Sequence, residues 1–415
     1  MRKKRFSAFL ALFAALALVG AACGGDEGGE TGATGATGGT GATAPVEKID
    51  VSVYGQGAWT GPYNYLVVPS FQSAQIAFDE LNADPTFPAT ITLEQADTQG
   101  SGDNAPPVVE EAVSNPNTVA ILGPAFSGES EASGDTYEEA GIPFISQSAT
   151  NPGLSQKGWT YWYRGVANDN DQGEPSARYL TDILSVDDIF VLHDKSTYGQ
   201  GLAEVVRDTL TANGSKVAGF EGVESGAEDF SAVISDVQAA DPGAVYFGGY
   251  DADFGKIVKQ ARDAGVTVPF MSGDGSVSST TVDLAGDALT DVFLSCPCNL
   301  SGDFVEKYNE AVGSEASSVP IYVGEGYDLA NMIGEGIRAA VAGGATDVAG
   351  IREGIKTYLD SLTVESPYVG VAKPYAFDPS THELAATDRE TLIFFYTAEP
   401  GSITVQGSAD EVLGG

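Results

Sequence analysis

The chain has 415 residues, of which 42% are hydrophobic and 9% aromatic, enough to fill two cores and too apolar for a disordered or fibrous protein. Its 58 acidic residues against 20 basic ones give a net charge of −38. Such a negative field repels phosphate backbones and anionic lipids, which argues against nucleic-acid binding and against adsorption to a membrane surface. We interpret the charge as a solubility trait rather than a binding site.

The N-terminus predicts export. Residues 1–23 have a basic start, an apolar run over 6–19 and a small-residue end, which is typical of a secretory signal and too short for a comfortable membrane span. Cys23 follows three small residues and resembles the lipobox cysteine of bacterial lipoproteins, although Gly20 stands where that motif has a leucine-like residue. We therefore expect Cys23 to carry a lipid anchor on the outer face of the cell membrane.

A tether separates this segment from the body of the protein. Residues 24–45 consist largely of Gly, Thr and Ala and offer almost nothing to bury. A Gly-rich coil of this length spans roughly 25 Å on average. We expect a flexible linker that holds a globular body away from the lipid surface.

From Lys48 onward, strand and helix patterns alternate. The segment 70–83 places apolar residues at helical spacing behind Ser70, a possible helix cap. The expected strands are KIDVSVYG, TVAILGP, IPFISQS, DDIFVLHD, KVAGFEGV, GAVYFGGY and VPFMSGD, and further helices are expected in YGQGLAEVVRDTLTANG and ADFGKIVKQARDAGV. This order predicts parallel sheets covered by helices on both faces, with ligands bound at the carboxyl ends of the strands.

Small polar residues follow at least four of these strands. IPFISQSATNPGL (142–154) ends in hydroxyls, an alanine and an Asn-Pro turn, and similar residues follow positions 122, 247 and 271. Turn chemistry alone can account for such residues. The alternative is that short side chains let a ligand approach the backbone N–H groups, and the residues themselves leave both explanations open.

Four segments, in order, resemble the leucine/isoleucine/valine-binding proteins, the type I periplasmic substrate-binding components of ABC importers. These are ILGPAFSGESEASGDTYEEAGIPFISQSATNPGL, VLHDKSTYGQGLA, VYFGGYDADFGKIVKQAR and FMSGDG. The resemblance implies two doubly wound α/β lobes with parallel sheets, joined by three crossovers and closing on a ligand. One lobe would hold residues 46–168 and 298–378, and the other 169–297 and 379–415.

The resemblance also implies a ligand site without a catalytic residue, metal or cofactor. It places ligand contacts at Ser127, Ser148, Thr150, Tyr250 and Asp274. An α-amino acid's carboxylate would meet the N-terminus of a helix that begins at Ser127, together with the strand end around Ser148 and Thr150, where Ala149 keeps the approach clear. Its ammonium would pair with Asp274, with Tyr250 closing the same region from the second lobe.

Two departures from the family pattern concern ligand size. Asp274 replaces a glutamate that is one methylene longer, and Leu66 stands where the family often has a ring packed on the ligand's side chain. Unless Tyr63 or Tyr65 moves in, both changes enlarge the pocket. We therefore expect an aliphatic or aromatic amino acid at least as large as leucine.

Other candidate motifs are weaker. Cys296 and Cys298 are separated by one residue, which favours a local disulfide or free thiols over a metal site. The sequence has no nucleophile elbow with which His193 could form a catalytic triad, so we interpret this histidine as structural. The segment 169–174 starts like a calcium loop but lacks the closing glutamate, and we expect the start of a helix. GQGAWTG lacks the third glycine of a dinucleotide site, and the aromatic cluster WTYWYRG predicts core or hinge packing.

These observations predict a non-enzymatic, monomeric binding protein that delivers an amino acid to the permease of an ABC importer by cleft closure. A short amide, urea or an aromatic acid is an alternative ligand, although a neutral molecule would leave Asp274 unpaired. A ligand sensor for a receptor would have the same sequence features. An exported hydrolase is disfavoured because nucleophile motifs are missing.

Overall fold

The computed structural model describes residues 48–300, 302–313 and 319–414, which belong to one compact unit, Pro45–Gly415. The predictions for the signal peptide (1–23), for Cys23 and for the linker (24–45) concern residues outside the described ones. Among the described residues, no helix combines the length and the apolar character needed to cross a membrane.

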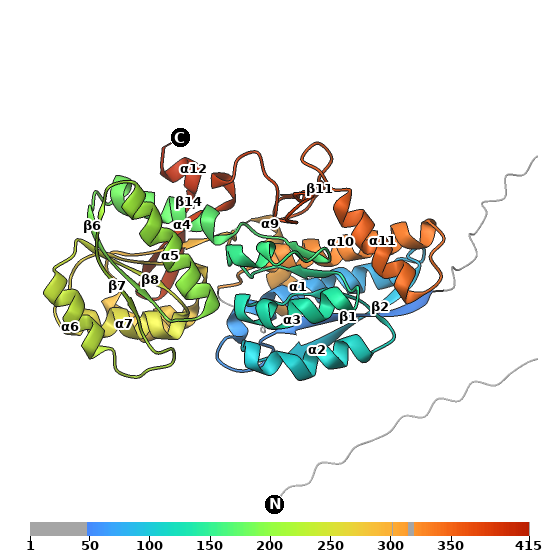
Figure 1. Cartoon of the computed structure of the whole chain (residues 1–415), viewed down its shortest axis with the longest axis horizontal. Coiled ribbons are helices and arrows are strands. Elements are labelled where there is room, and N and C mark those ends of the chain that lie inside the picture. Colours follow the sequence, from blue (N-terminus) through green and yellow to red (C-terminus); the bar gives the residue numbers. More distant parts are fainter. Residues whose placement is uncertain (1–47, 301, 314–318, 415) are drawn as a thin grey trace, which may run out of the picture. The chain divides into compact units, whose positions relative to one another are not determined.

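The first lobe is built on a five-stranded, fully parallel sheet (Figure 1). The strand order is β2-β1-β3-β4-β5, with β1 Ile49–Gly57, β2 Ala89–Asp97, β3 Thr118–Leu122, β4 Phe144–Ser146 and β5 Trp162–Arg164. Successive residues of β1 serve opposite faces, since Val51 and Val53 belong to one core cluster and Tyr54 to another. Burial on both faces is why these strands read as continuous apolar runs.

Helices cover both faces of this sheet. On one side lie α1 (Asn64–Ala83), α10 (Val323–Ala342) and α11 (Val348–Asp360), with α9 (Asp303–Val312) beside them, and on the other lie α2 (Ala105–Ser114) and α3 (Ser127–Glu139). The expected cap of the first helix is wrong. Ser70 lies inside α1, fully buried, and its hydroxyl donates to the Val67 carbonyl (2.9 Å) rather than capping a terminus.

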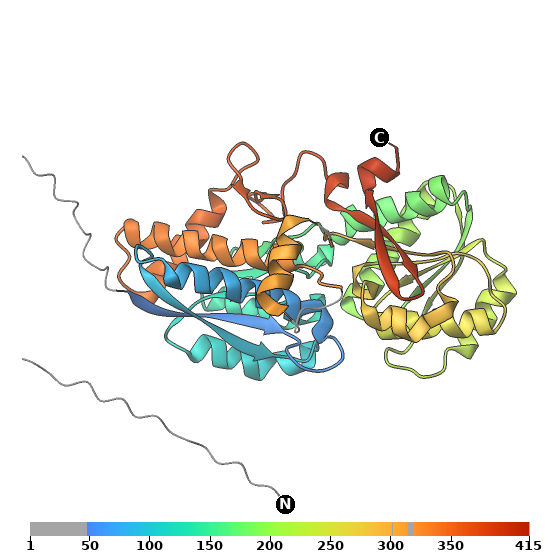
Figure 2. The ribbon, with the colours of Figure 1, turned by 180° about the vertical axis from the view of Figure 1, so that it is seen from behind.

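The second lobe is built on a seven-stranded sheet whose edge is antiparallel. The order is β14-β13-β10-β9-β8-β6-β7, with β6 Asp188–His193, β7 Lys216–Gly222, β8 Ala244–Gly248, β9 Phe270–Ser272, β10 Val292–Cys296, β13 Phe394–Glu399 and β14 Ser402–Ser408. Strands β6 to β10 are parallel, whereas β13 and β14 form an antiparallel hairpin along the edge (Figure 2). The predicted parallel sheet therefore has an added antiparallel edge, in which a two-residue turn joins β13 to β14.

Helices also cover both faces of the second sheet. On β8, Phe247 stacks on Phe254 of α7, whereas Gly248 lies against Gly199 and Ala203 of α5. The helices are α4 (Asp169–Arg178), α5 (Thr197–Ala212), α6 (Ser231–Ala240), α7 (Asp251–Asp263), α8 (Ser279–Ala285) and α12 (Ala409–Val412). A separate two-stranded sheet pairs β11 (Tyr368–Val369) with β12 (Pro374–Tyr375). The predicted helix start at 169 is confirmed.

The chain passes between the sheets three times: after β5, after β10 and before β13. The α/β class with two lobes and three crossovers is therefore confirmed. We propose that the lobes consist of residues 46–168 with 298–378, and 169–297 with 379–415, because each predicted boundary falls in one of these connections.

Candidate functional site

A small cavity lies where strands of the two sheets end. Residues of both lobes line it: Leu66, Ala125, Phe126, Ser127, Ser148, Tyr198, Tyr250 and Asp274. Its volume of about 10 Å³ is close to the minimum that a single water needs. The structure thus brings five of the predicted residues together, while Ala149 and Thr150 are buried but do not line the cavity. An amino acid requires the surrounding rings or lobes to move.

The first lobe contributes what we call the hydroxyl end: Ser127, Ser148 and Thr150. Ser127 is the first residue of α3, and its hydroxyl accepts a hydrogen bond from the Asn151 backbone N–H (3.2 Å). The Ser148 hydroxyl donates to the Ala125 carbonyl (2.8 Å). The Thr150 hydroxyl is buried and lies close enough to the Asp169 carboxyl to lower its pKa. Two of these hydroxyls therefore hold the backbone in place, and the third lies beside the buried acid Asp169.

Ala149 is fixed by its backbone. Its N–H donates to the Ser146 hydroxyl (2.9 Å), and its carbonyl accepts from Arg164 (2.6 Å). Arg164 is completely buried and forms a two-pronged ion pair with Glu383 (2.9 and 3.0 Å). Because the third crossover carries Glu383, the ion pair ties the strand end after β4 to that connection.

Asp274 occupies a short 3-10 turn after β9. One carboxylate oxygen accepts from the Tyr198 hydroxyl (2.8 Å) and the other from the Tyr322 hydroxyl (2.7 Å). Burial raises the pKa of Asp274, while these hydrogen bonds act to lower it. Phenols thus already engage both oxygens of the predicted ammonium partner, and an ammonium would have to use their remaining lone pairs.

A second carboxylate, Asp169, escaped the sequence reasoning. It opens α4 and is fully buried, its backbone N–H donates to the Thr150 carbonyl (2.9 Å), and its carboxyl lies close enough to the Thr150 hydroxyl for that group to lower its pKa. Burial, followed by the charge of nearby Asp274, raises the pKa of Asp169 well above its usual range. We call Asp169 and Asp274 the acid end. No local signal in the sequence marks Asp169, because its burial near Asp274 is decided by the fold.

Aromatic rings wall off the cavity. The ring centroid of Tyr250 lies 4.9 Å from that of Tyr63, 5.9 Å from Phe126 and 5.2 Å from Tyr198. Beyond these rings lies an outer chamber of about 670 Å³ that the same four residues help to line. Sequence reasoning selected only Tyr250. Tyr198 was available in the quoted STYGQGLA motif, whereas nothing in the sequence singled out Phe126.

Leu66 projects from α1 and is almost completely buried beside the cavity. Its neighbour Tyr65 is pinned, because the Tyr65 hydroxyl donates to the Gly275 carbonyl (2.5 Å) of the second lobe. Tyr63 belongs to the aromatic wall. Neither tyrosine is among the residues that line the inner cavity at Leu66.

The sequence pattern of one protein family, described as "Periplasmic binding protein", matches residues 57–389. The chain belongs to this family. The leucine-specific-binding protein of Salmonella typhimurium is 30% identical over 258 residues, which cover 62% of this chain and 70% of that protein. The Leu/Ile/Val-binding protein of Escherichia coli is 30% identical over 60% of this chain and 68% of its own length.

A solved structure shows the same fold. A leucine binding protein from Thermotoga maritima superimposes with a TM-score of 0.75 at 23% identity, covering 86% of this chain and 98% of its own. As a member of the periplasmic binding protein family, the chain is a binding protein and not an enzyme.

The remaining predictions concern places outside the cavity of this binding protein. Cys296 and Cys298 are joined by a disulfide at the end of β10. His193 accepts a hydrogen bond from the Lys195 backbone N–H (3.1 Å). The described residues contain no group of three or more His, Cys, Asp or Glu that could hold a metal ion.

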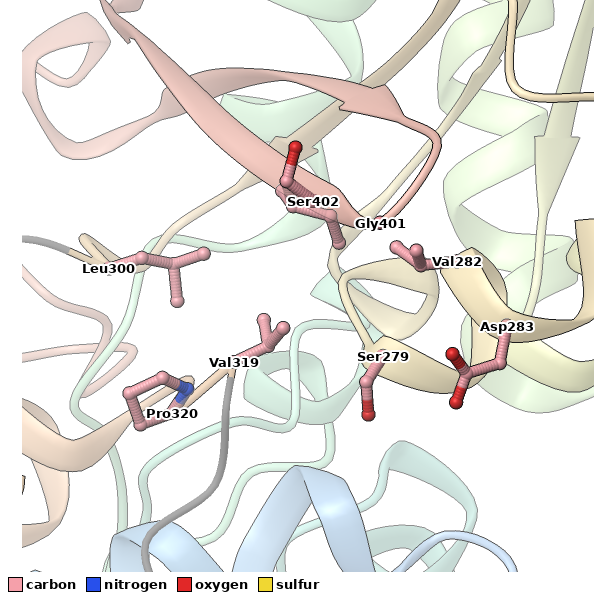
Figure 3. A pocket seen from close by; sticks show the side chains of 9 residues that line it. Ser279, Val282, Asp283, Leu300, Val319, Pro320, Gly401 and Ser402 are labelled. Atoms are coloured by element: carbon pink, nitrogen blue, oxygen red, sulfur yellow. The ribbon is translucent and has the colours of Figure 1, made fainter. Parts of the chain in front are cut away.

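A separate cavity of about 460 Å³ is not the predicted site. Figure 3 shows Val282, Leu300 and Val319 around it, together with the turn between β13 and β14 at Gly401 and Ser402. No predicted ligand residue lines this cavity.

Proposed function

We propose that this periplasmic binding protein captures a zwitterionic amino acid outside the cytoplasm and delivers it to the permease of an ABC importer. The observation that carries the proposal is the set of groups that meet at one cavity: hydroxyls and a helix N-terminus from one lobe, and the buried carboxylate of Asp274 from the other, with Asp169 buried near Asp274. An α-carboxylate suits the first and an α-ammonium the second.

The ammonium partners in this proposal are Asp274 and Asp169 together. Asp274 alone is a weak argument for a cation, because two phenols already hydrogen-bond it. Asp169 strengthens the case, since it is buried close enough to Asp274 for the charge of Asp274 to raise its pKa, and a cation bound here would offset that repulsion. Tyr250, Leu66 and the hydroxyl end would contact the rest of the ligand, with Ala149 keeping the backbone approach open.

We propose a branched-chain or larger amino acid as the ligand. The names of the two relatives described above support this class, since they refer to leucine, isoleucine and valine. A solved relative from Streptococcus pneumoniae is described in complex with isoleucine, with a TM-score of 0.73 and 23% identity. The test is native mass spectrometry of the co-purifying molecule, followed by calorimetry with a panel of amino acids, amides and aromatic acids. Tightest binding of a neutral amide or of benzoate would contradict the proposal.

Deletion of the gene distinguishes a role in transport from a role in sensing. If the protein serves an importer, deletion of its gene should abolish high-affinity uptake of the labelled ligand. Unchanged uptake would instead favour a receptor-linked sensor.

We further propose that acylated Cys23 anchors the protein to the membrane. Cys23→Ser should then move the protein from the membrane fraction to the medium, with ligand binding unchanged. Retention of the variant in the membrane fraction would contradict the lipid anchor.

A further inference from the structure

We infer that Asn151 is a closure latch: its side-chain amide holds the first turn of α5 against the strand end after β4, and so fixes the distance between the hydroxyl end and the acid end. The inference deepens the proposed function and rests on it. It assigns a positioning role to a residue that does not line the cavity.

The contact joins the lobes without any ligand atom. Asn151 follows β4 of the first sheet, and its Nδ2 donates to the carbonyl of Thr197, the first residue of α5 in the second lobe (2.7 Å). Its Oδ1 accepts from the Gly153 N–H (2.8 Å), which orients the amide so that its donor faces α5. A second hydrogen bond, from the Thr197 hydroxyl to Glu131 of α3 (3.4 Å), connects the same surfaces.

Each side of the latch is attached to one end of the ligand site. The Asn151 backbone N–H donates to the Ser127 hydroxyl, and the Asn151 carbonyl accepts from buried Arg164. On the other side, Thr197 precedes Tyr198, whose hydroxyl donates to Asp274. Seating α5 on Asn151 therefore places Tyr198, and through it Asp274, opposite the hydroxyl end.

The surface of α5 is shaped for this contact. Gly201 faces Asn151 one turn after Thr197, and a Cβ added at Gly201 would lie 2.4 Å from Asn151 Nδ2. Glycine inside a helix costs stability relative to alanine. A glycine here is explained by the room that the latch needs, since the atoms that this Cβ would meet, Nδ2 and Cγ, both belong to Asn151.

Four variants test the latch, and the simplest, Asn151→Ala, removes its side-chain amide. Asn151→Asp keeps the acceptor for Gly153 but presents an oxygen to the Thr197 carbonyl, so the contact becomes repulsive. Gly201→Ala blocks the contact while improving the helix. In the double variant Asn151→Ala/Gly201→Ala, truncation of residue 151 makes room for the methyl group, so the two effects should not add. Gln200→Ala, at an exposed neighbouring position of α5, is the matched control.

Stopped-flow binding of leucine should show dissociation accelerated about five- to tenfold in Asn151→Asp and Gly201→Ala, because loss of the latch favours the open state from which the ligand leaves. Gly201→Ala should at the same time melt at or above the wild-type temperature. In the double variant, dissociation should be no faster than in Asn151→Ala alone. The inference would be overturned if Asn151→Asp and Gly201→Ala both released leucine at the wild-type rate. It would also be overturned if the effects of Asn151→Ala and Gly201→Ala on dissociation added up in the double variant.

Small-angle X-ray scattering separates failure of the latch from failure of the proposed function. If the wild-type protein binds no amino acid, the proposed function is wrong, yet the latch still predicts a larger radius of gyration for ligand-free Asn151→Asp than for wild type and Gln200→Ala. Equal radii would overturn the latch whatever the ligand is.

Discussion

The two ends of the cavity solve the problem of a buried zwitterion in different ways. At the hydroxyl end, neutral groups hydrogen-bond one another, as Ser148 does with Ala125 and Ser127 with Asn151. At the acid end, two carboxylates are buried close together and raise each other's cost of ionisation. The first end is organised before a ligand arrives, whereas the second is electrostatically incomplete until a cation enters.

The largest expected effect therefore belongs to the acid end. Asp274→Asn removes a desolvated charge, which costs about 3–5 kcal/mol when an ion pair is broken. Amino-acid affinity measured by calorimetry should fall at least about a hundredfold, while the exposed control Asp287→Asn should bind like wild type. Binding within threefold of wild type would reduce Asp274 to a turn residue held by Tyr198 and Tyr322.

The neutrality of the hydroxyl end depends on Glu129, a fully buried acid on α3 that hydrogen-bonds Thr98 and the Phe126 N–H. Burial raises the pKa of Glu129 to about 7. Because the folded protein holds this proton more tightly than the unfolded chain, stability falls as the pH rises from the ordinary carboxyl range to about 7. At higher pH the buried charge costs about 3 kcal/mol.

Glu129→Gln should accordingly raise the melting temperature by several degrees at pH 8 and change it little at pH 5, where the wild-type side chain is already neutral. Thermal unfolding across this pH range checks the sign. A stabilisation that is the same at both pH values would show that Glu129 is not the titrating group.

Leu66 tests the space between the two ends. Each buried methylene contributes about 0.8 kcal/mol, so the wild type should prefer leucine over alanine by roughly two orders of magnitude. Leu66→Trp should fill the pocket, weakening the largest ligands most and sparing the smallest. The proposed contact between Leu66 and the ligand's side chain would be contradicted if Leu66→Trp lost the same affinity for every amino acid in a calorimetric panel. Tightest wild-type binding of glycine would contradict it too.

The smallest expected effect belongs to the hydroxyl end itself. Ser148→Ala deletes one neutral hydrogen bond, to the Ala125 carbonyl, and should lower affinity about fivefold. Calorimetry at the pH used for Asp274→Asn gives a direct comparison. A loss as large as that of Asp274→Asn would mean that the two ends do not differ in the way proposed here.

The sequence by itself determined the α/β class, most strands of both sheets and the small residues that end them. Continuous apolar runs such as β3 and β6 are buried on both faces wherever they lie, so their pattern is readable without the fold. Ser127, Ser148, Tyr250 and Asp274 could be proposed because they lie in segments that resemble one family, and Leu66 because its position matches that of a ring in the family pattern.

Only the tertiary structure decided which groups complete the site. Tyr322 lies far from Asp274 in sequence, yet its hydroxyl takes up one carboxylate oxygen. Asp169 looked like an ordinary helix start, and its importance comes from burial beside Asp274, which no local pattern encodes. The pairing of Asn151 with Gly201 arises from the meeting of two lobes. Local patterns predict what one segment does with its own backbone, whereas hydrogen bonds and charges between distant segments exist only after the chain has folded.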